Sequence, residues 1–341
     1  MANILAIESS CDETSAAVYN STKDIILSNI IFSQIEYHRK YGGVVPEIAS
    51  RSHLQKIRPV IELALSKANI LLNNIDSIAV TYKPGLPGSL LVGLSFAKAI
   101  AWSQKIKLIG VNHLEGHIFS ACIENKIPFP FLCITASGGH TALYIVYDYG
   151  KFELLGQTLD DAAGEAFDKI AKLINLGYPG GPIIEKLAKQ VNFEDFFDYP
   201  KHIMENSYDF SFSGLKTAVL YDLIKKEAYN PKEKKFLKDD NLYFKQQVAS
   251  SFLNSIAINF EQKVALAIKN NLKIKAVSFV GGVACNNYIK SRLKKLCAKY
   301  KINLFWPSPQ YCTDNAAMIA YVAAYKYKNN KFSNLSLDID N

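Results

Sequence analysis

The amino-acid sequence predicts an α/β protein built from two domains of related design. Its 341 residues exceed one average domain and fit two. An apolar run, a small polar turn and a second apolar run occur at residues 3–20, and the same layout returns at 131–147. A strand, a Gly-containing turn and a helix are predicted at both 76–93 and 276–290. Because each pattern occurs once in each half, we infer a duplication.

The first predicted domain spans residues 1–125. Its opening strands are NILAIE (3–8) and SAAVYN (15–20), two apolar runs on either side of the turn SSCDET. Apolar spacing predicts the remaining elements, which are helices at 53–69 and 87–104 and a strand at 106–111.

The second predicted domain spans residues 126–327. Apolar residues at helical spacing predict helices at 160–176, 243–270 and 314–327. The segment 177–240 is irregular, aromatic and charged, so we expect an insertion there. The polar, Asn-rich tail 328–341 is expected to fray, and the terminal helix is a candidate to pack back on the N-terminal domain.

The composition excludes several classes of protein. It is 49% apolar and 21% charged, which is typical of a folded soluble chain. The N-terminus lacks the pattern of a signal or transit peptide, and no window reaches the ~18 apolar residues of a membrane span. The six cysteines are isolated in the sequence, without CxxC or CxxH pairs. We therefore expect them to be reduced thiols. We therefore expect a cytoplasmic protein without a membrane segment.

The net charge of +8 arises from 39 Lys and Arg against 31 Asp and Glu, and it suits a polyanionic partner. The excess concentrates in two clusters, at 225–238 and 290–301. Such clusters are usually solvated helix faces, so charge alone favours a nucleic acid only weakly. These two lysine-rich clusters are the candidates for contact with a nucleic acid.

The sharpest local feature is His113-Leu114-Glu115-Gly116-His117, which follows a predicted strand directly. Residues i and i+4 share one face of a helix, so both imidazoles can reach one metal. Ligands of α/β sheets bind at the C-terminal ends of strands, which favours a site here. An isolated HxxxH nevertheless arises more often from chance spacing or capping. Glu115 falls off this face, and the HExxH order of zinc peptidases is absent.

A site with two histidines needs a third ligand, and Asp314, at the start of the last predicted helix, is the best candidate. The alternative is that Thr313 or Asp314 only caps that helix, although both roles can coexist. Two imidazoles and one carboxylate leave coordination positions open, as in reactive metal sites. We expect one divalent metal per subunit, iron(II) or zinc, and no redox or vitamin cofactor. Asp314 falls in the second predicted domain, so the metal would bridge the two domains.

Two Gly-containing turns suggest a nucleotide site. Ser137-Gly138-Gly139-His140-Thr141 joins two strands, and its backbone amides can approach a phosphate because glycine has no β-carbon. The turn Gly281–Asn286 follows a strand and opens a helix, which suits the adenosine or phosphate part of a nucleotide. Neither matches a Walker A or GxGxxG motif, so each alone could be a tight turn. Their related positions favour binding.

Ten motifs resemble, in order, those of the TsaD family of tRNA N6-adenosine threonylcarbamoyltransferases. They run from residue 4 to about 327 and are LAIESSCDET, YGGVVPEIASR, PGLPGSLLVG, NHLEGH, TASGGHT, DDAAGEAFDK, YPGGP, DFSFSGLK, GGVACN and CTDNAAMIA. Single motifs are weak, but ten in sequence are highly specific.

This resemblance implies the actin, Hsp70 and sugar-kinase fold, with two RNase H-like domains around a nucleotide cleft. It implies that the metal ligands are His113, His117 and Asp314. The residues that hold the phosphate and the acyl donor are implied to be Thr135, Ala136, Ser137, Gly138 and Gly139. Asp168, Gly181 and Asn286 are implied to lie around the ribose and base. Glu185 falls where some members of the family have a further polar contact.

The implied reaction moves a threonylcarbamoyl group from threonylcarbamoyl-adenylate to N6 of adenosine 37, in tRNAs that read codons beginning with A. It forms t6A and releases AMP. Glu13 or Asp12, in the first hairpin turn, could take the proton from the attacking nitrogen. The implied partners are tRNA, a smaller related fold-mate (TsaB-like) and a P-loop ATPase (TsaE-like).

The sequence departs from the family pattern at two places. Lys83 precedes Pro84-Gly85-Leu86 where many relatives have glycine, and Ala284 stands where they have serine. The second change removes a hydroxyl that could contact the nucleotide, but it leaves the glycine turn intact.

Three other functions compete with acyl transfer. A small-molecule kinase of the same fold would use ATP and magnesium and would not need the paired histidines. A metallopeptidase would need a general-base Glu beside the first His, which is absent. A non-catalytic nucleotide-binding scaffold would have no reason to keep three residues of metal-ligand type.

Overall fold

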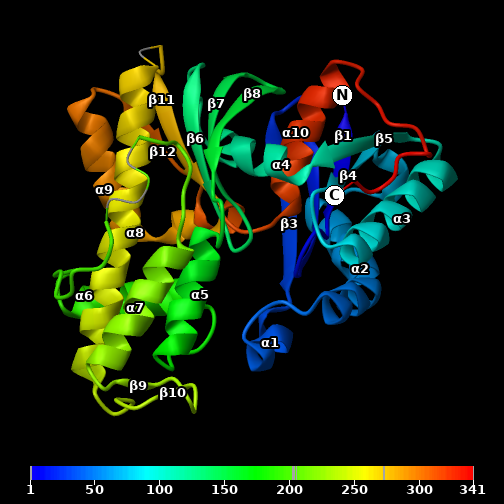
Figure 1. Ribbon diagram of the computed structural model, residues 1–341. Helices are drawn as coiled ribbons and strands as arrows, with labels where there is room; N and C mark the ends of the chain where they lie inside the picture. Colours follow the sequence, from blue (N-terminus) through cyan, green and yellow to red (C-terminus); the bar gives the residue numbers. More distant parts are fainter. Residues whose placement is uncertain (1, 202–203, 205, 272, 341) are drawn as a thin grey trace. The chain divides into compact units, whose positions relative to one another are not determined.

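The fold is that of a computed structural model, which describes residues 2–201, 204, 206–271 and 273–340 (Figure 1). It divides into two compact units: unit 1 comprises residues 1–125 and 307–341, and unit 2 comprises 126–306. The sequence had assigned 307–327 to the second domain. The difference has a physical cause, because helix α10 (Ala316–Lys328) packs on strands of unit 1 and on helix α4 (His113–Ser120).

The sheet of unit 1 has five strands in the order β3-β2-β1-β4-β5. Strands β1, β2 and β3 form antiparallel hairpins, whereas β4 and β5 run parallel to β1. Their bounds are β1 Asn3–Glu8, β2 Glu13–Asn20, β3 Ile25–Ser33, β4 Ser77–Lys83 and β5 Lys107–Asn112.

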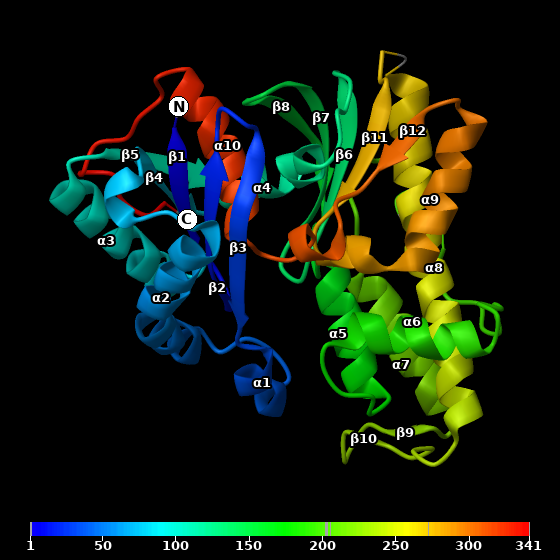
Figure 2. The same ribbon diagram turned by 180° about the vertical axis from the view of Figure 1, so that it is seen from behind.

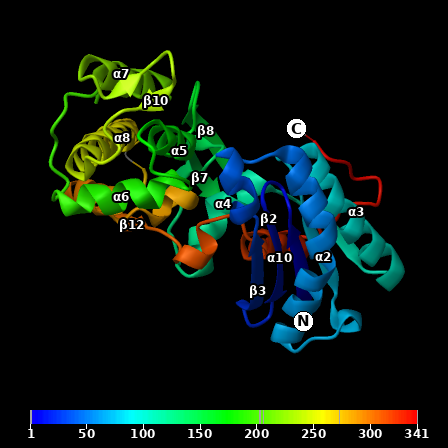
Figure 3. The ribbon, with the colours of Figure 1, turned by 90° about the horizontal axis from the view of Figure 1, so that it is seen from below.

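Helices α2 (Pro46–Ala68) and α3 (Pro87–Gln104) lie on one side of this sheet (Figure 3). Leu5 and Ile7 of β1 pack into the apolar core with them. Side chains alternate along a strand, so Ile4 and Ala6 face the other side, where α10 contacts β1 and β2. The short helix α1 spans Ile35–His38.

The sheet of unit 2 repeats this topology, with the order β12-β11-β6-β7-β8. Strands β6, β7 and β8 are joined as antiparallel hairpins, and β11 and β12 run parallel to β6. Their bounds are β6 Phe131–Ala136, β7 Thr141–Asp148, β8 Lys151–Gln157, β11 Ala276–Val280 and β12 Asn303–Phe305. The predicted α/β duplication is confirmed.

Helices cluster around the long central helix α8 of unit 2 (Figure 2). Their bounds are α5 Ala163–Leu173, α6 Gly180–Gln190, α7 Ser213–Lys225, α8 Leu242–Asn270 and α9 Asn287–Lys299. The segment 177–240 was expected to be an irregular insertion, but it contains α6, α7 and a small hairpin of β9 (Tyr229–Asn230) and β10 (Lys235–Phe236). Since α6 packs closely on α8, this segment contributes to the core of the unit.

Short 3-10 helices connect several elements of both units. They span Arg39–Tyr41, Leu72–Asn74, Ala121–Ile123, Gly282–Cys285 and Pro309–Tyr311. Within the described part of the chain, no helix is both long and apolar enough to cross a membrane.

The tail after α10 is bound to unit 1, so the prediction that it frays is wrong. The backbone N–H of Ser333 donates to the carbonyl of Leu108 (2.8 Å), and its hydroxyl accepts from the N–H of Gly110 (3.1 Å). Leu337 and Ile339 pack against the apolar core of the unit. Two apolar side chains and a bridge to β5 are enough to hold a segment whose composition is mostly polar.

Candidate metal centre and nucleotide-binding loops

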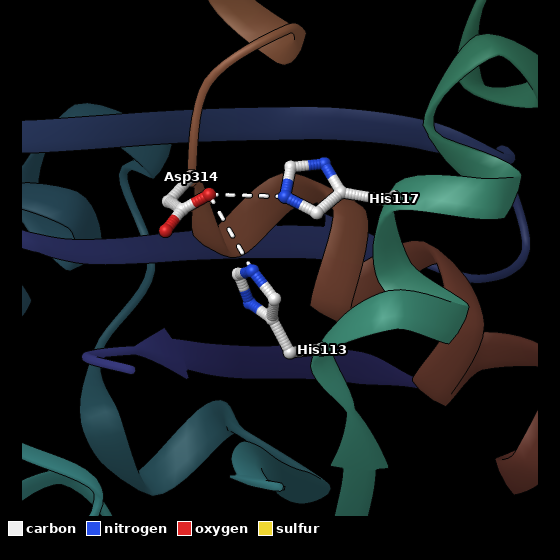
Figure 4. Close-up of side chains that lie close together, drawn as sticks. All are labelled: His113, His117 and Asp314. Atoms are coloured by element: carbon white, nitrogen blue, oxygen red, sulfur yellow. Dashed lines mark hydrogen bonds and ion pairs between the residues drawn. The ribbon is translucent and has the colours of Figure 1, made fainter. Parts of the chain in front are cut away.

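Helix α4 begins at His113 because Asn112, the last residue of β5, caps it. The Asn112 side chain accepts hydrogen bonds from the N–H groups of Leu114 (2.8 Å) and Glu115 (3.3 Å). The helix therefore begins directly after β5. His113 and His117 lie one turn apart on the same helix face, with ring centroids 4.6 Å apart. Figure 4 shows both rings turned toward Asp314.

Asp314 is brought to the histidines by the start of α10. The N-cap of that helix is Asn315, whose side chain accepts from the N–H of Met318 (3.0 Å), so the alternative that Thr313 or Asp314 serves as the cap is wrong. Oδ1 of Asp314 lies 3.0 Å from Nε2 of His117 and 3.5 Å from Nε2 of His113. All three residues belong to unit 1, so they do not bridge two domains as expected.

Gly116 permits the close approach of α4 and α10. A β-carbon at this position would lie 2.9 Å from Cδ1 of Ile319 and 3.1 Å from Cγ of Met318. Glu115 points elsewhere, to an ion pair of 2.9 Å with Lys326. Glu115 is thus engaged away from the histidine pair, which argues against the role of a peptidase base.

Glu8, at the end of β1, holds His113 from the side away from Asp314. Its carboxylate is fully buried and accepts hydrogen bonds from the N–H of Ser10 (2.6 Å) and the hydroxyl of Thr81 (2.6 Å). The second oxygen lies 3.1 Å from Nδ1 of His113. A histidine whose Nδ1 proton is donated to a carboxylate presents its Nε2 lone pair, the usual arrangement around a metal-bound imidazole.

Charge inside this cluster shifts the pKa values of its members. Burial alone would lower the pKa of His113, but the carboxylates of Asp314 and Glu8 outweigh it and raise the pKa to about 9. Burial alone would raise the pKa of Glu8, but the charge and hydrogen bond of His113 lower it. A metal that binds here must displace the His113 proton, so its affinity should depend on pH.

The three side chains fit a divalent metal. Their ligand atoms all lie within 4.8 Å of one another. Ligands about 2.0–2.2 Å from a zinc ion are separated by roughly 3.4 Å in a tetrahedron, close to the separations found here. Nδ1 of His117 is buried and has no hydrogen-bond partner among the described residues. Two imidazoles and one carboxylate suit iron(II) or zinc and leave coordination positions open.

Asp12 and Glu13 belong to the same unit as this centre. Asp12 is buried in the first hairpin turn, and Glu13 begins β2, where its carboxylate accepts a hydrogen bond of 3.3 Å from the hydroxyl of Ser33. Burial, followed by the charges of Asp12 and Asp314, raises the pKa of Glu13 well above its usual range. Such a shift moves a carboxyl toward the range useful for proton transfer.

The predicted phosphate-binding loop lies at the end of β6 in unit 2. Thr135 and Ala136 are buried strand residues, whereas Gly138 and Gly139 are exposed, with no atom within 4 Å of where a β-carbon would stand. The N–H of Gly164, in the first turn of α5, donates to the carbonyl of Ser137 (3.1 Å). A β-carbon on Gly164 would lie 2.6 Å from that carbonyl oxygen, so the helix start rests directly on the loop.

At Gly281, the second glycine turn contacts the end of β6, the strand that precedes the predicted phosphate-binding loop. Its φ is +91°, and a β-carbon would lie 2.4 Å from the carbonyl oxygen of Ala136. Gly282 has no such contact. The structure therefore places both predicted turns next to each other in unit 2 and assigns the conformational requirement to Gly281 alone.

The other predicted nucleotide contacts form a linked series in unit 2. Asp168 of α5 accepts a hydrogen bond of 2.6 Å from the N–H of Gly180, which starts α6, and Gly181 follows beside open space. Glu185 of α6 accepts from the N–H groups of Asn287 (2.7 Å) and Tyr288 (3.0 Å) at the start of α9. Asn286 caps α9 by accepting from the N–H of Ile289 (3.0 Å). Asp168, Glu185 and Asn286 thus carry structural bonds.

Sequence reasoning missed Glu8 and Ser10. The hydroxyl of Ser10 lies 3.0 Å from Nδ1 of His113, beside the Glu8 carboxylate. One signal was available, since an acidic residue that ends a strand otherwise buried and apolar must find a charged or donor partner.

Comparison with known proteins gives a consistent picture. A family model described as "TsaD: tRNA N6-adenosine threonylcarbamoyltransferase" matches residues 25–321. Two similar relatives carry that same enzyme description. The protein of Clostridioides difficile is 48% identical over 336 residues, covering 98% of this chain and 96% of its own. That of Thermodesulfovibrio yellowstonii is 48% identical over 339 residues, with coverages of 98% and 97%.

Solved structures resemble the chain in fold. Full-length HypF, in a phosphate- and nucleotide-bound form, matches with a TM-score of 0.62 at 16% identity, covering 97% of this chain and 56% of HypF. Component A of the Acidaminococcus fermentans (R)-2-hydroxyglutaryl-CoA dehydratase matches with a TM-score of 0.54 at 14% identity, with coverages of 96% and 99%. The predicted actin, Hsp70 and sugar-kinase fold is confirmed by these neighbours and by the two mixed five-stranded sheets.

Proposed function

The chain belongs to the TsaD family and forms t6A as a tRNA N6-adenosine threonylcarbamoyltransferase, and from this we propose how its residues divide the reaction. The donor is threonylcarbamoyl-adenylate, and the acceptor is N6 of adenosine 37 in tRNAs that read codons beginning with A. The nitrogen attacks the carbamoyl carbon, the bond from that carbon to the phosphate oxygen breaks, and AMP leaves with the electron pair. With tRNA as the substrate, we place the reaction in the cytoplasm.

His113, His117 and Asp314 hold the divalent metal in this proposal. The observation that carries it is their convergence, with Nε2 of both histidines within 3.5 Å of the same Asp314 oxygen. A metal held there would supply Lewis-acid chemistry. Glu8 and Ser10 keep the imidazole of His113 oriented, so the Nε2 atom stays directed at Asp314.

The loop at Ser137–Gly139 binds the phosphate of the donor through backbone N–H groups. The exposed, unobstructed glycines support this role, because a phosphate oxygen can approach their amides without meeting a side chain. The positions of Asp168, Gly181, Glu185 and Asn286, which are linked to this loop through α5, α6 and α9, support contacts with the ribose and base. Ala284 contributes no hydroxyl to them.

The proton of the attacking nitrogen leaves to Glu13, with Asp12 as the alternative. Both carboxyl groups lie at the first hairpin turn, in the same unit as the proposed metal ligands, and this placement supports the choice. The remaining catalysis consists of positioning and charge stabilisation. Both are required when an acyl group is transferred from an activated donor. The partners that we propose are a smaller fold-mate of the TsaB type and a P-loop ATPase of the TsaE type.

A reconstituted reaction tests the proposal. The wild-type chain, incubated with its partners, threonylcarbamoyl-adenylate and tRNA, should yield t6A that mass spectrometry detects after nuclease digestion. His117→Ala should lose both the bound metal and at least about 100-fold in rate, because one of three ligands is gone. Glu115→Gln, in the same helix turn but outside the centre, should retain both. Full activity of His117→Ala would remove the metal from the mechanism.

A further inference from the structure

The net positive charge of the chain comes almost entirely from unit 2. Unit 2, residues 126–306, holds 25 Lys and Arg against 18 Asp and Glu, whereas unit 1 holds 14 against 13. The net charges are therefore +7 and +1, which together give the +8 of the whole chain. A polyanion would be attracted to unit 2.

Within unit 2, the excess collects in one stretch of sequence. Residues 262–306 contain 10 Lys and Arg and no acidic residue. In the described part of the chain, neither Lys269 nor Lys275 nor Lys301 forms an ion pair, and all three are exposed. Their charges are available to a ligand.

The other lysine cluster, at 225–238, is accompanied by acidic residues. Lys226 pairs with Asp222, and Lys238 lies over the ring of Phe244. Glu227 and Glu233 lie among its lysines, and Asp239 and Asp240 follow directly, whereas residues 262–306 hold no acidic residue. The two stretches therefore differ in how many acidic residues accompany their lysines.

The three free lysines surround a pocket of about 550 Å³ at the C-terminal end of α8. Its lining residues come from the end of α8, the two residues just before β11, and the turn between α9 and β12. Lys269, Lys275 and Lys301 provide the charged lining, while Ile268, Ile274 and Ile302 provide the apolar part together with Tyr300.

We propose that this pocket, named here the α8–α9 pocket, binds the phosphodiester backbone of the tRNA substrate. A phosphodiester chain alternates charged phosphates with less polar ribose faces, which matches lysines around an apolar lining. Neighbouring Lys273, Lys294 and Lys299, exposed on the same stretch of unit 2, extend the attraction along the strand. The contact positions the RNA and does not read its sequence.

The proposal rests on tRNA being the substrate. The test uses the wild-type chain and a variant with Lys269→Glu, Lys275→Glu and Lys301→Glu, with tRNA binding followed by fluorescence anisotropy at several salt concentrations. We expect a loss of at least roughly ten-fold in affinity near physiological salt, and a salt slope reduced by about 1 for each lysine removed. A variant with Gln at the same positions should give a smaller loss and guards against misfolding caused by new acidic groups.

The control is a second triple reversal in the 225–238 cluster, Lys225→Glu, Lys232→Glu and Lys234→Glu. These lysines are also exposed, and their reversal changes the net charge equally within the same unit. It should bind tRNA with a smaller loss than the α8–α9 variant. Equal losses in both triples, or an unchanged α8–α9 variant, would overturn the pocket as the binding site.

Failure of the pocket can be told apart from failure of the proposed reaction. His117→Ala should bind tRNA like the wild type while forming no t6A. If the wild type forms t6A and binds tRNA, but the α8–α9 variant binds equally well, only the pocket is wrong. If the wild type binds tRNA through these lysines but forms no t6A, only the proposed chemistry is wrong.

Discussion

Glu8 orients one of the two histidines of the candidate metal site. A carboxylate buried without solvent is costly unless donors surround it, and Glu8 has three, from Ser10, Thr81 and His113. It therefore fixes the ring of His113 by the same bonds that compensate its own burial. His117 has no corresponding partner on Nδ1 among the described residues.

Replacing Glu8 should weaken the metal site without removing a ligand. In Glu8→Gln, one acceptor oxygen becomes an NH₂ donor and the negative charge is lost, so the orientation of His113 and its basicity both decrease. We expect zinc affinity to fall about 10–100-fold, measured by competition with a chelator. Glu115→Gln, another buried acid but paired with Lys326, should leave the affinity unchanged. Identical affinities in the two variants would contradict the role assigned to Glu8.

At the scale of elements, the glycine turn after β11 packs against the end of β6, next to the proposed phosphate-binding loop. Gly281 has φ +91° and ψ 173°, a region open essentially only to glycine, and its α-carbon lies against the backbone of Ala136. The adjacent Gly282 has an ordinary conformation with open space around it. The two glycines of GGVACN are therefore not equivalent.

Gly281→Ala should destabilise unit 2, and Gly282→Ala should not. The first change adds backbone strain and an overlap with a carbonyl oxygen that cannot rotate away, for a cost of at least about 2 kcal/mol. Calorimetry should show a melting temperature lower by roughly 4–8 °C for a unit of this size. A melting temperature within about 1 °C of wild type for Gly281→Ala would mean that the turn relaxes easily, contrary to our interpretation.

At the scale of the whole molecule, the chain begins in unit 1, builds unit 2 and returns to unit 1 for its last 35 residues, 307–341. This return supplies Asp314, the helix α10 that covers one side of the first sheet, and the tail on β5. Asp314 and the two histidines of the candidate metal site are thus about 200 residues apart in sequence yet belong to one folding unit.

The tail should contribute measurable stability to unit 1. Leu337 packs against its core, and Cδ2 of Leu337 lies 2.8 Å from where a β-carbon on Gly110 would stand. Leu337→Ala should cost about 1–2 kcal/mol in the free energy of unfolding. Leu335, which is 44% exposed, is the matched control, and its replacement by alanine should change stability by less than about 0.5 kcal/mol. Equal effects would restore the expectation of a frayed tail.

Local sequence patterns were sufficient to predict the central strands and helices. The apolar runs of β1 and β6 and the helical spacing of α3 and α8 predict those elements because their residues are buried on regular faces. The edge strands β3, β8 and β12 were not predicted, since few of their residues are fully buried and they lack a buried alternation. Pairing with a neighbouring strand stabilises them, and pairing leaves little trace in a single segment.

The same division applies to the metal centre. The sequence by itself determined that His113 and His117 share a face, because four residues of helix place them one turn apart whatever surrounds them. Only the tertiary structure decided that Asp314 meets them within unit 1, that Asn315 is the cap, and that Glu8 holds His113. Helix geometry acts over a few residues, whereas contacts between distant segments depend on how helices and strands pack, which no local spacing encodes.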